Sequence, residues 1–280
     1  MADNALYVVA TPIGNLADMV PRAIETLQTV DVIAAEDTRH SARLLEHFHI
    51  STPMVAYHDH SGEHRTGQLI ERLGRGQSVA LISDAGTPLV SDPGYQLVRA
   101  AREAGVRVVP VPGASALVAA LSAAGLPSNR FAFEGFLSAK RGARQQALRE
   151  LAADTRTLIF YEAPHRIAES LADMAQIFGE QREIVMAREL TKTFETIHGA
   201  PARALAEWVA ADSNQQRGEI VVLVRGAERR ETSEIDAEAE RVMTVLLEEL
   251  SVKQASALGA KITGLKKKPL YQWALAQQED

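Results

Sequence analysis

The chain has 280 residues, 46% of them hydrophobic and 24% charged, and its formal net charge is -6. It contains no cysteine, which excludes a disulfide framework, thiolate metal ligands and a thiol nucleophile. The first residues lack the basic and apolar regions of a signal peptide, and no apolar run approaches the roughly 18 residues of a membrane span. We therefore expect a cytoplasmic protein with no membrane partner.

The first 115 residues alternate short apolar runs with helical patterns. Strands are predicted at 6–10, 31–35, 54–57, 78–82 and 106–109, and helices at 21–29, 36–48, 65–73 and 93–104. Pro21 suits the first turn of its helix, where a backbone N–H has no intrahelical partner. Uniformly apolar strands that alternate with helices are typical of a parallel sheet covered on both faces. Residues 1–115 are thus expected to form an α/β domain with a doubly wound parallel sheet.

A second α/β domain is predicted over residues 116–230, after a small-residue helix that ends at Gly125. Its strands are expected near 131–135, 157–161, 183–187, 193–198 and 219–225, and its helices near 141–153, 165–177 and 201–211. The strands at 183–187 and 193–198 are close enough in sequence to be antiparallel neighbours, so this sheet should be mixed. Residues 231–280 are expected to form a C-terminal domain of three helices, with Ser251 as an N-cap and a turn at Gly264.

Basic residues gather at two places in this acidic chain. They are Lys140, Arg141, Arg144 and Arg149 in the middle, and Lys261, Lys266, Lys267 and Lys268 near the end. Local basic patches bind phosphates whatever the net charge, but both groups are equally compatible with solvated helix faces. The C-terminal helices, with lysines beside their turn, are either an RNA contact or a packing module.

Four loops rich in proline and glycine follow predicted strands. They are 11–16 (TPIGNL), 83–88 with 91–94 (SDAGTP and SDPG), 110–115 (PVPGAS) and 160–166 (FYEAPHR). Ligands of open α/β sheets bind at the carboxyl ends of the strands, and such loops let the backbone approach a ligand closely. None of them matches GxGxxG or GxxxxGK[ST], so nicotinamide and P-loop nucleotide binding lose their usual support.

The order of these motifs carries a resemblance to a known family. TPIGNLAD, AAEDTRHS, SDAGTPLVSDPG, PVPGASA, FEGF, FYEAPHR, REL-TK and GEIVVLV follow one another between about Leu6 and Val224. Together they resemble the tetrapyrrole-methylase-like, class III S-adenosylmethionine methyltransferases, and within these the bacterial 16S rRNA cytidine-2′-O-methyltransferases. The resemblance implies two α/β domains around bound S-adenosyl-L-methionine and a homodimer. It also implies methylation of a cytidine ribose in the decoding region of the small ribosomal subunit, with no DNA partner.

The resemblance also implies which residues bind the cofactor. They are Pro12, Ser83, Asp84, Ala85, Thr87, Pro88, Ala114, Ser115, Tyr161 and Glu219. Pro12 would lie in the loop on the substrate side, and the residues from Ser83 to Ser115 at the methionine end. The sulfonium is cationic, so Asp84 can oppose it without transferring a proton. Tyr161 and the backbone around Glu219 would supply the apolar slot and the polar partners that an adenine needs.

A ribose hydroxyl is a poor nucleophile, so a nearby base or hydrogen-bond acceptor is expected. Glu36, Asp37 and Arg39 are the first catalytic candidates because EDTRH follows a predicted strand directly. Arg39 and Arg166 could hold flanking phosphates. Other candidates for the base are His40, His58, Asp59, Glu162 and His165. Asp37 is also a good helix N-cap, which would be a structural role.

Three alternatives stay open. A tetrapyrrole or diphthine-type protein methyltransferase would share the fold. A metal-dependent hydrolase is suggested by His58, Asp59, His60, His64, Asp84 and Asp92. Adjacent His-Asp-His residues point in different directions and lack the i, i+4 spacing that brings two ligands together, so we expect no metal site. A non-catalytic binding module is disfavoured because four loops have the character of a cofactor site.

Overall fold

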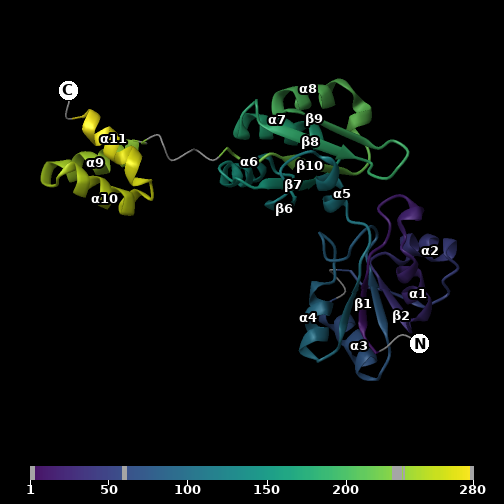
Figure 1. Ribbon diagram of the computed structural model, residues 1–280. Helices are drawn as coiled ribbons and strands as arrows, with labels where there is room; N and C mark the ends of the chain where they lie inside the picture. Colours follow the sequence, from purple (N-terminus) through teal and green to yellow (C-terminus); the bar gives the residue numbers. More distant parts are fainter. Residues whose placement is uncertain (1–3, 59–61, 229–234, 236, 278–280) are drawn as a thin grey trace. The chain divides into compact units, whose positions relative to one another are not determined.

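The computed structural model describes residues 4–58, 62–228, 235 and 237–277. The chain divides into two compact units, Met1–Gly226 and Ala227–Asp280 (Figure 1). The first unit holds two sheets, and the elements formed by the described residues of the second unit are all helices. A further division of the first unit at residue 115 stays a prediction.

The first sheet has five parallel strands: β1 (Leu6–Val9), β2 (Val32–Ala35), β3 (Met54–Ala56), β4 (Val79–Ile82) and β5 (Val108–Val111). Their order is β3-β2-β4-β1-β5, so β1 lies between β4 and β5. The loops that leave these three neighbouring strands therefore share one edge of the sheet. They are three of the four loops singled out from the sequence.

Helices cover both faces of this sheet. One face packs against α1 (Pro21–Thr29) and α2 (Thr38–His47), and the other against α3 (Gly62–Gly74) and α4 (Tyr95–Glu103), as Figure 1 shows. Leu27 of α1 joins the core of the first face, and Leu97 of α4 joins the core of the second. The inner strands β2 and β4 are buried along their whole length, as expected for a sheet covered on both faces, whereas β3 and β5 at the edges are only partly buried. The predicted doubly wound parallel sheet is confirmed.

The second sheet is mixed, as predicted. Its strands are β6 (Phe131–Phe136), β7 (Thr157–Glu162), β8 (Glu183–Arg188), β9 (Thr196–Pro201) and β10 (Ile220–Val224). They are ordered β6-β7-β10-β8-β9. Only β6 and β7 are parallel, and β8 and β9 are the expected antiparallel neighbours.

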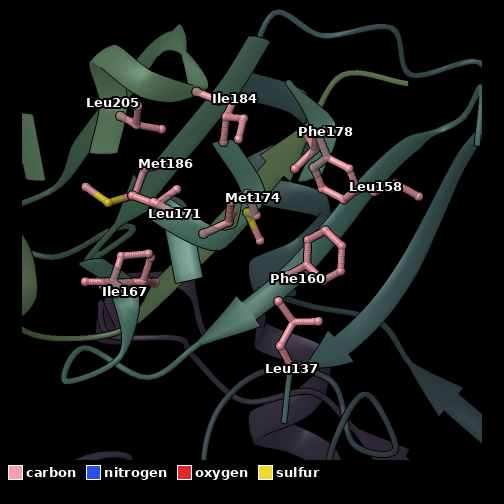
Figure 2. Close-up of a cluster of buried hydrophobic side chains, with 14 of the residues drawn as sticks. Leu137, Leu158, Phe160, Ile167, Leu171, Met174, Phe178, Ile184, Met186 and Leu205 are labelled. Carbon is pink, nitrogen blue, oxygen red and sulfur yellow. The ribbon is translucent and has the colours of Figure 1, made fainter. Parts of the chain in front are cut away.

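The two faces of the second sheet have different cover. One face packs against α6 (Arg141–Leu151), α7 (Ile167–Phe178) and α8 (Ala202–Ala211). Figure 2 shows Leu158 and Phe160 of β7 beside Met174 of α7 in this core. The other face packs against α5 (Ala116–Ala123) through alternate strand residues such as Ile159. This second face also lines the candidate site.

The basic group at 140–149 is not a continuous surface patch, because Arg144 is buried. Its side chain is 0% exposed and donates to Asp173 (2.8 Å), itself 1% exposed, and to Glu169 (3.2 Å). Asp173 also accepts from Arg141 and Gln145. This ion-pair network joins α6 to α7, so Arg144 is unavailable to an external phosphate.

The C-terminal unit consists of α9 (Ala237–Glu249), α10 (Val252–Thr263) and α11 (Lys267–Ala276). Its own small core comprises Ala239, Met243, Ala255, Leu270 and Ala274. Ser251 and Gln254 form a capping box at the start of α10, and Gly264 ends that helix at φ +74°. The predicted three helices and both caps are confirmed. No helix among the described residues is long and apolar enough to span a bilayer.

Candidate active site

A cavity of about 370 Å³ lies in the first unit and is lined by residues from both sheets. The first half of the chain contributes Ile13, Ala85, Gly86, Thr87, Val90, Ser91, Asp92, Ser115 and Ala116. The second half contributes Phe136, Tyr161, Glu162, Ala163, Pro164, Ala187, Leu190, Gly218, Glu219, Ile220 and Val221. The size and the apolar character with a few polar groups are those of a small-molecule site.

Hydrogen bonds fasten together the three loops that leave β1, β4 and β5. The backbones of Thr11 and Gly86 exchange two N–H···O bonds of 2.8 and 3.1 Å. The Thr11 hydroxyl also donates to the Ser83 carbonyl (3.3 Å). The Thr87 hydroxyl donates to the Ala114 carbonyl (2.9 Å). These bonds join the three loops into one wall of the cavity.

The loop after β4 contains backbone conformations that few residues adopt. Gly86 has φ +82°, and a Cβ atom there would lie 3.1 Å from Ile13 Cγ2. Leu89 and Ser91, which are not glycines, have φ values of 72° and 65°. Such conformations cost about 1–3 kcal/mol each and persist where the surroundings enforce them, often at functional sites. Two of the positive-φ residues that are not glycine therefore fall in this loop, and two others, Glu189 and Thr191, flank the lining residue Leu190.

Three aromatic rings pack together beside the cavity, and two of them, Tyr161 and Phe136, line it. Tyr161 of β7 lies between Phe133 and Phe136 of β6, with edge-to-face contacts and centroids 4.8 and 5.6 Å apart. Burial raises the pKa of the Tyr161 phenol, and a hydrogen bond with the Leu117 backbone opposes this. The phenol therefore remains neutral at physiological pH and offers an aromatic surface with a polar end.

Glu162 is the most tightly held carboxylate of the lining. It is buried, and its Oε1 atom accepts from the Ala163 N–H (2.8 Å) and pairs with the Arg166 guanidinium (2.9 Å). Its Oε2 atom accepts from the Ser170 hydroxyl (2.5 Å). The Arg166 guanidinium, just before α7, therefore already binds the Glu162 carboxylate. This ion pair competes with the phosphate contact that was expected for Arg166.

A second group of ion pairs joins Lys192, Glu189 and Glu219. The Lys192 ammonium donates to Glu189 (2.9 Å) and to Glu219 (3.1 Å). Glu189 also accepts from the Glu219 N–H (2.9 Å). The Lys192 stem lies against Gly14, where an added Cβ would be 2.5 Å from Lys192 Cγ. Lys192 thus connects the loop after β1 to the start of β10.

The charge of the lining is one-sided. Asp92, Glu162 and Glu219 are carboxylates, whereas none of the described residues that line the cavity is Lys, Arg or His. A phosphate would meet like charge there, and a cation would meet opposite charge. Arg166 and Lys192 pair with Glu162 and Glu219 from outside the lining, so part of this negative charge is offset. The acidic surface beside an aromatic ring is compatible with a compact cationic ligand that carries an aromatic group.

Half of the predicted cofactor residues line the cavity. These are Ala85, Thr87, Ser115, Tyr161 and Glu219. The others do not line it, although each lies within two residues of a lining residue: Pro12, Ser83, Asp84, Pro88 and Ala114. Asp92, which the sequence suggested only as a metal ligand, brings a carboxylate to the lining where Asp84 does not.

The three predicted catalytic residues lie beside this wall and do not line the cavity. The Asp84 N–H donates to Glu36 (3.4 Å), and the Asp37 N–H donates to Asp84 (3.1 Å). Asp37 caps α2 by accepting from the Arg39 and His40 N–H groups (2.8 and 3.4 Å). These N–H groups lower the pKa of the Asp37 carboxyl, which makes it a weaker base. Arg39 is exposed.

The other polar candidates are dispersed. His58 and His64 line a separate cavity of about 280 Å³ with Arg65 and Gln68. His165 is exposed, and Asp59 and His60 lie outside the described residues. Among the described residues no group of three or more His, Asp or Glu side chains could hold a metal ion. The absence of a metal site stays a prediction.

Sequence reasoning missed several lining residues, among them Phe136, Leu190 and Gly218. Phe136 belongs to FEGF and Leu190 to REL-TK, two motifs that carried the resemblance without any assigned role. A glycine inside a predicted strand signals a bulge or a close approach. The signal was therefore present in FEGF.

Tight loops at the ends of parallel strands, aromatic rings and acidic side chains surround one cavity, which defines a two-sheet protein with a small-molecule site. Residues 5–206 match the family described as Tetrapyrrole (Corrin/Porphyrin) Methylases, and the chain belongs to that family. Residues 233–278 match the RsmI C-terminal HTH domain. The second match covers the three-helix unit.

Two similar proteins that carry the same name align with this chain over almost their whole length. Ribosomal RNA small subunit methyltransferase I of Pseudomonas aeruginosa is 60% identical over 279 residues, 99% of both chains. Its namesake in Escherichia coli O157:H7 is 54% identical, covering 99% of this chain and 98% of that protein.

Two solved structures share the fold at low identity. Uroporphyrin-III-C-methyltransferase from Thermus thermophilus has a TM-score of 0.57 at 20% identity and covers 79% of this chain and 94% of its own. Diphthine synthase has a TM-score of 0.59 at 18% identity and covers 79% and 90%. These likenesses support the predicted tetrapyrrole-methylase arrangement.

Proposed function

We propose that this chain uses S-adenosyl-L-methionine to methylate the ribose 2′-hydroxyl of a cytidine in 16S rRNA, within the decoding region of the small ribosomal subunit. The observation that carries the cofactor assignment is the acidic lining, which holds no Lys, Arg or His among the described residues. The names of the two relatives that are 54% and 60% identical support the ribosomal substrate.

The lining residues fit this cofactor. Tyr161 and the backbone at Glu219 and Ile220 would hold the adenosine. Small residues such as Ala85 and Ser115 leave room for the methionine end. When bound, S-adenosylmethionine supplies an electrophilic methyl group on a cationic sulfur.

The chain itself contributes placement and electrostatics. The wall of loops would fix the donor, and correct placement of two reactants is worth about 7–11 kcal/mol of a barrier. Asp92 opposes positive charge without needing to move a proton. For the hydroxyl proton, Glu36, Asp37 and Glu162 remain the candidate acceptors, with Arg39 as a phosphate contact.

The assembly is proposed to be a homodimer in the cytoplasm, where ribosomal subunits are found. Large apolar side chains remain exposed on the first unit, including Val118, Phe194 and Ile197. Exposed apolar groups of this kind favour a protein interface. Sedimentation equilibrium of the full chain tests the dimer, and a monomer at micromolar concentration would refute it.

A tetrapyrrole or diphthine-type protein substrate is the second candidate. The uroporphyrin-III-C-methyltransferase and diphthine synthase structures share the fold at no more than 20% identity, so they supply no argument about the substrate.

The experiment that tests the proposed function is transfer of labelled methyl to small subunits that lack the modification, with mapping of ribose methylation. A single 2′-O-methylcytidine supports the proposal. Donor binding without labelling of RNA would favour the second candidate.

The cavity itself is tested by Asp92→Asn, with Glu25→Gln as a control that removes a carboxylate from the exposed face of α1. We expect Asp92→Asn to weaken donor binding in calorimetry by about tenfold, because one charge–charge contact of this kind is worth about 1–2 kcal/mol. Equal donor affinity in the two variants would remove the electrostatic argument.

A further inference from the structure

An irregularity in β6 directs Phe136 into the cavity. Phe133 pairs with Ile159 of β7, but the next pairs are Gly135 with Phe160 and Phe136 with Tyr161. Glu134 is therefore the extra residue of a β-bulge, and Gly135 adopts φ +66° there. Regular alternation would place Phe133 and Phe136 on opposite faces of the sheet. The bulge places both rings against Tyr161.

The Phe136 ring contacts Tyr161 and is otherwise largely exposed to solvent. Its ring meets Tyr161 at an interplanar angle of 65°, it lines the cavity, and it is 55% exposed. A ring that served only to pack would be covered. Bulges beside active sites commonly re-aim a side chain, and here the re-aimed group is an exposed aromatic ring.

Two basic residues, Lys140 and Arg141, follow Phe136 closely in the sequence. Lys140 comes four residues after Phe136 and precedes α6, and Arg141 is the first residue of that helix. Both are exposed, and Arg141 keeps a 3.1 Å contact with Asp173 that fixes its position. The four residues from Phe136 to Lys140 span at most about 14 Å, and the five to Arg141 at most about 18 Å, so both cations lie within that reach of the ring.

We infer that Phe136 stacks on the base of the acceptor nucleotide while Lys140 and Arg141 meet the adjoining phosphates. An aromatic platform beside basic side chains is the chemistry that binds unpaired nucleotides of RNA. The stacked base would orient its ribose toward the cavity that holds the methyl donor. The inference rests on the proposed function, because it requires an RNA acceptor at this cavity.

The test compares Phe136→Ala, Phe136→Leu and Phe136→Trp with a matched control, Phe131→Ala. Phe131 is an exposed ring on the same strand, 43% exposed, and does not line the cavity. Donor affinity is measured by calorimetry, and the KM for unmodified small subunits is measured at saturating donor.

We expect Phe136→Ala to raise this KM by about 5- to 150-fold, the cost of losing one base stack. Donor affinity should fall by a smaller factor than the KM rises, because Tyr161 and the loops after β1, β4 and β5 still line the cavity; retained donor binding also shows that the cleft is folded. Phe136→Trp should restore the KM and Phe136→Leu should not, because only an aromatic ring stacks.

Two results overturn the inference. If Phe136→Ala weakens donor binding and leaves the KM for subunits unchanged, the ring is a cofactor contact. If Phe136→Ala matches Phe131→Ala in both measurements, the ring has no role in binding. A wild-type chain that transfers no methyl to subunits would overturn the proposed function first, and this inference with it.

Discussion

Replacing Lys192 by methionine removes an ammonium group and keeps an unbranched apolar stem. The stem would still cover Gly14, so the change isolates the ion pairs with Glu189 and Glu219. Lys192→Arg keeps the charge and is the matched control. The variant tests whether this group stabilises the start of β10, where Glu219 lines the cavity.

The two ion pairs differ in exposure, and so should their contributions. Glu189 is 19% exposed, and a partly buried hydrogen bond between charged groups contributes about 1.5–3 kcal/mol. Glu219 is 69% exposed, and a pair with an exposed carboxylate contributes about 0–1 kcal/mol. Glu189 keeps its bond from the Glu219 N–H in the variant. We therefore expect Lys192→Met to lower the free energy of unfolding by about 2–3 kcal/mol.

Urea unfolding of the first unit measures this loss, and its pH dependence tests the cause. Burial alone would raise the pKa of Glu189, but its hydrogen bonds with Lys192 and the Glu219 N–H hold it below the usual value. Burial alone would lower the pKa of Lys192, but its bonds with Glu189 and Glu219 hold it above the usual value.

The sign follows from these two directions. A lowered carboxyl pKa stabilises the fold above the usual Glu pKa, and this is lost as pH falls through the lowered value. A raised lysine pKa stabilises the fold below the usual Lys pKa, and this is lost as pH rises through the raised value. The difference between wild type and Lys192→Met should thus be largest between about pH 5 and 10. A difference below about 0.5 kcal/mol at pH 7, or one unchanged at pH 3, would refute the reasoning.

Three further predictions concern single sites. Arg144→Met should lower the free energy of urea unfolding by about 3–5 kcal/mol because it leaves Asp173 charged and buried, and adding Asp173→Asn should recover most of it; no recovery would contradict the pairing argument. Gly86→Ala should cost about 1–3 kcal/mol in the same assay and weaken donor binding, because it strains φ +82° and crowds Ile13. Asp37→Ala should lower the melting temperature, and Asp37→Ser should restore it as an N-cap. If Asp37→Ser restores stability but not methyl transfer, Asp37 also acts in the chemistry.

Local sequence was sufficient for the elements of the fold. Pro21 and the apolar positions after it define α1 at the predicted residues. The short interval between 183–187 and 193–198 favoured an antiparallel pair, and the pair forms, although its second strand begins three residues later than predicted, at Thr196. The burial of Arg144 was not predictable in this way. Its partner Asp173 is 29 residues away on another helix, and no local pattern distinguishes it from an exposed arginine.

In the candidate site, too, features with a local cause were predictable from the sequence and features that depend on long-range contacts were not. Loop chemistry pointed to the loops at 83–88 and 110–115, because glycine and proline at strand ends have a local cause, whereas the family resemblance supplied Ala85, Thr87 and Ser115 within them. The contact of Asp84 with Glu36 depends on β2 and β4 being neighbours, which strand order decides and local sequence does not. Phe136 needed the pairing register with β7, which is a long-range property.

The order of strands has a consequence for how the chain is made. β1 emerges first from a ribosome, yet its partners β4 and β5 begin at residues 79 and 108. At about 5–20 residues per second, the apolar first strand waits several seconds or more for a partner.

The second sheet delays its closure even longer. β10, at residues 220–224, is the central strand that joins β7 to β8. A nascent chain that stops before residue 220 would carry two separate strand pairs, each with an unpaired edge open to aggregation. Truncations in this region should therefore be recovered as insoluble protein, whereas a stop after residue 226 should leave a complete sheet.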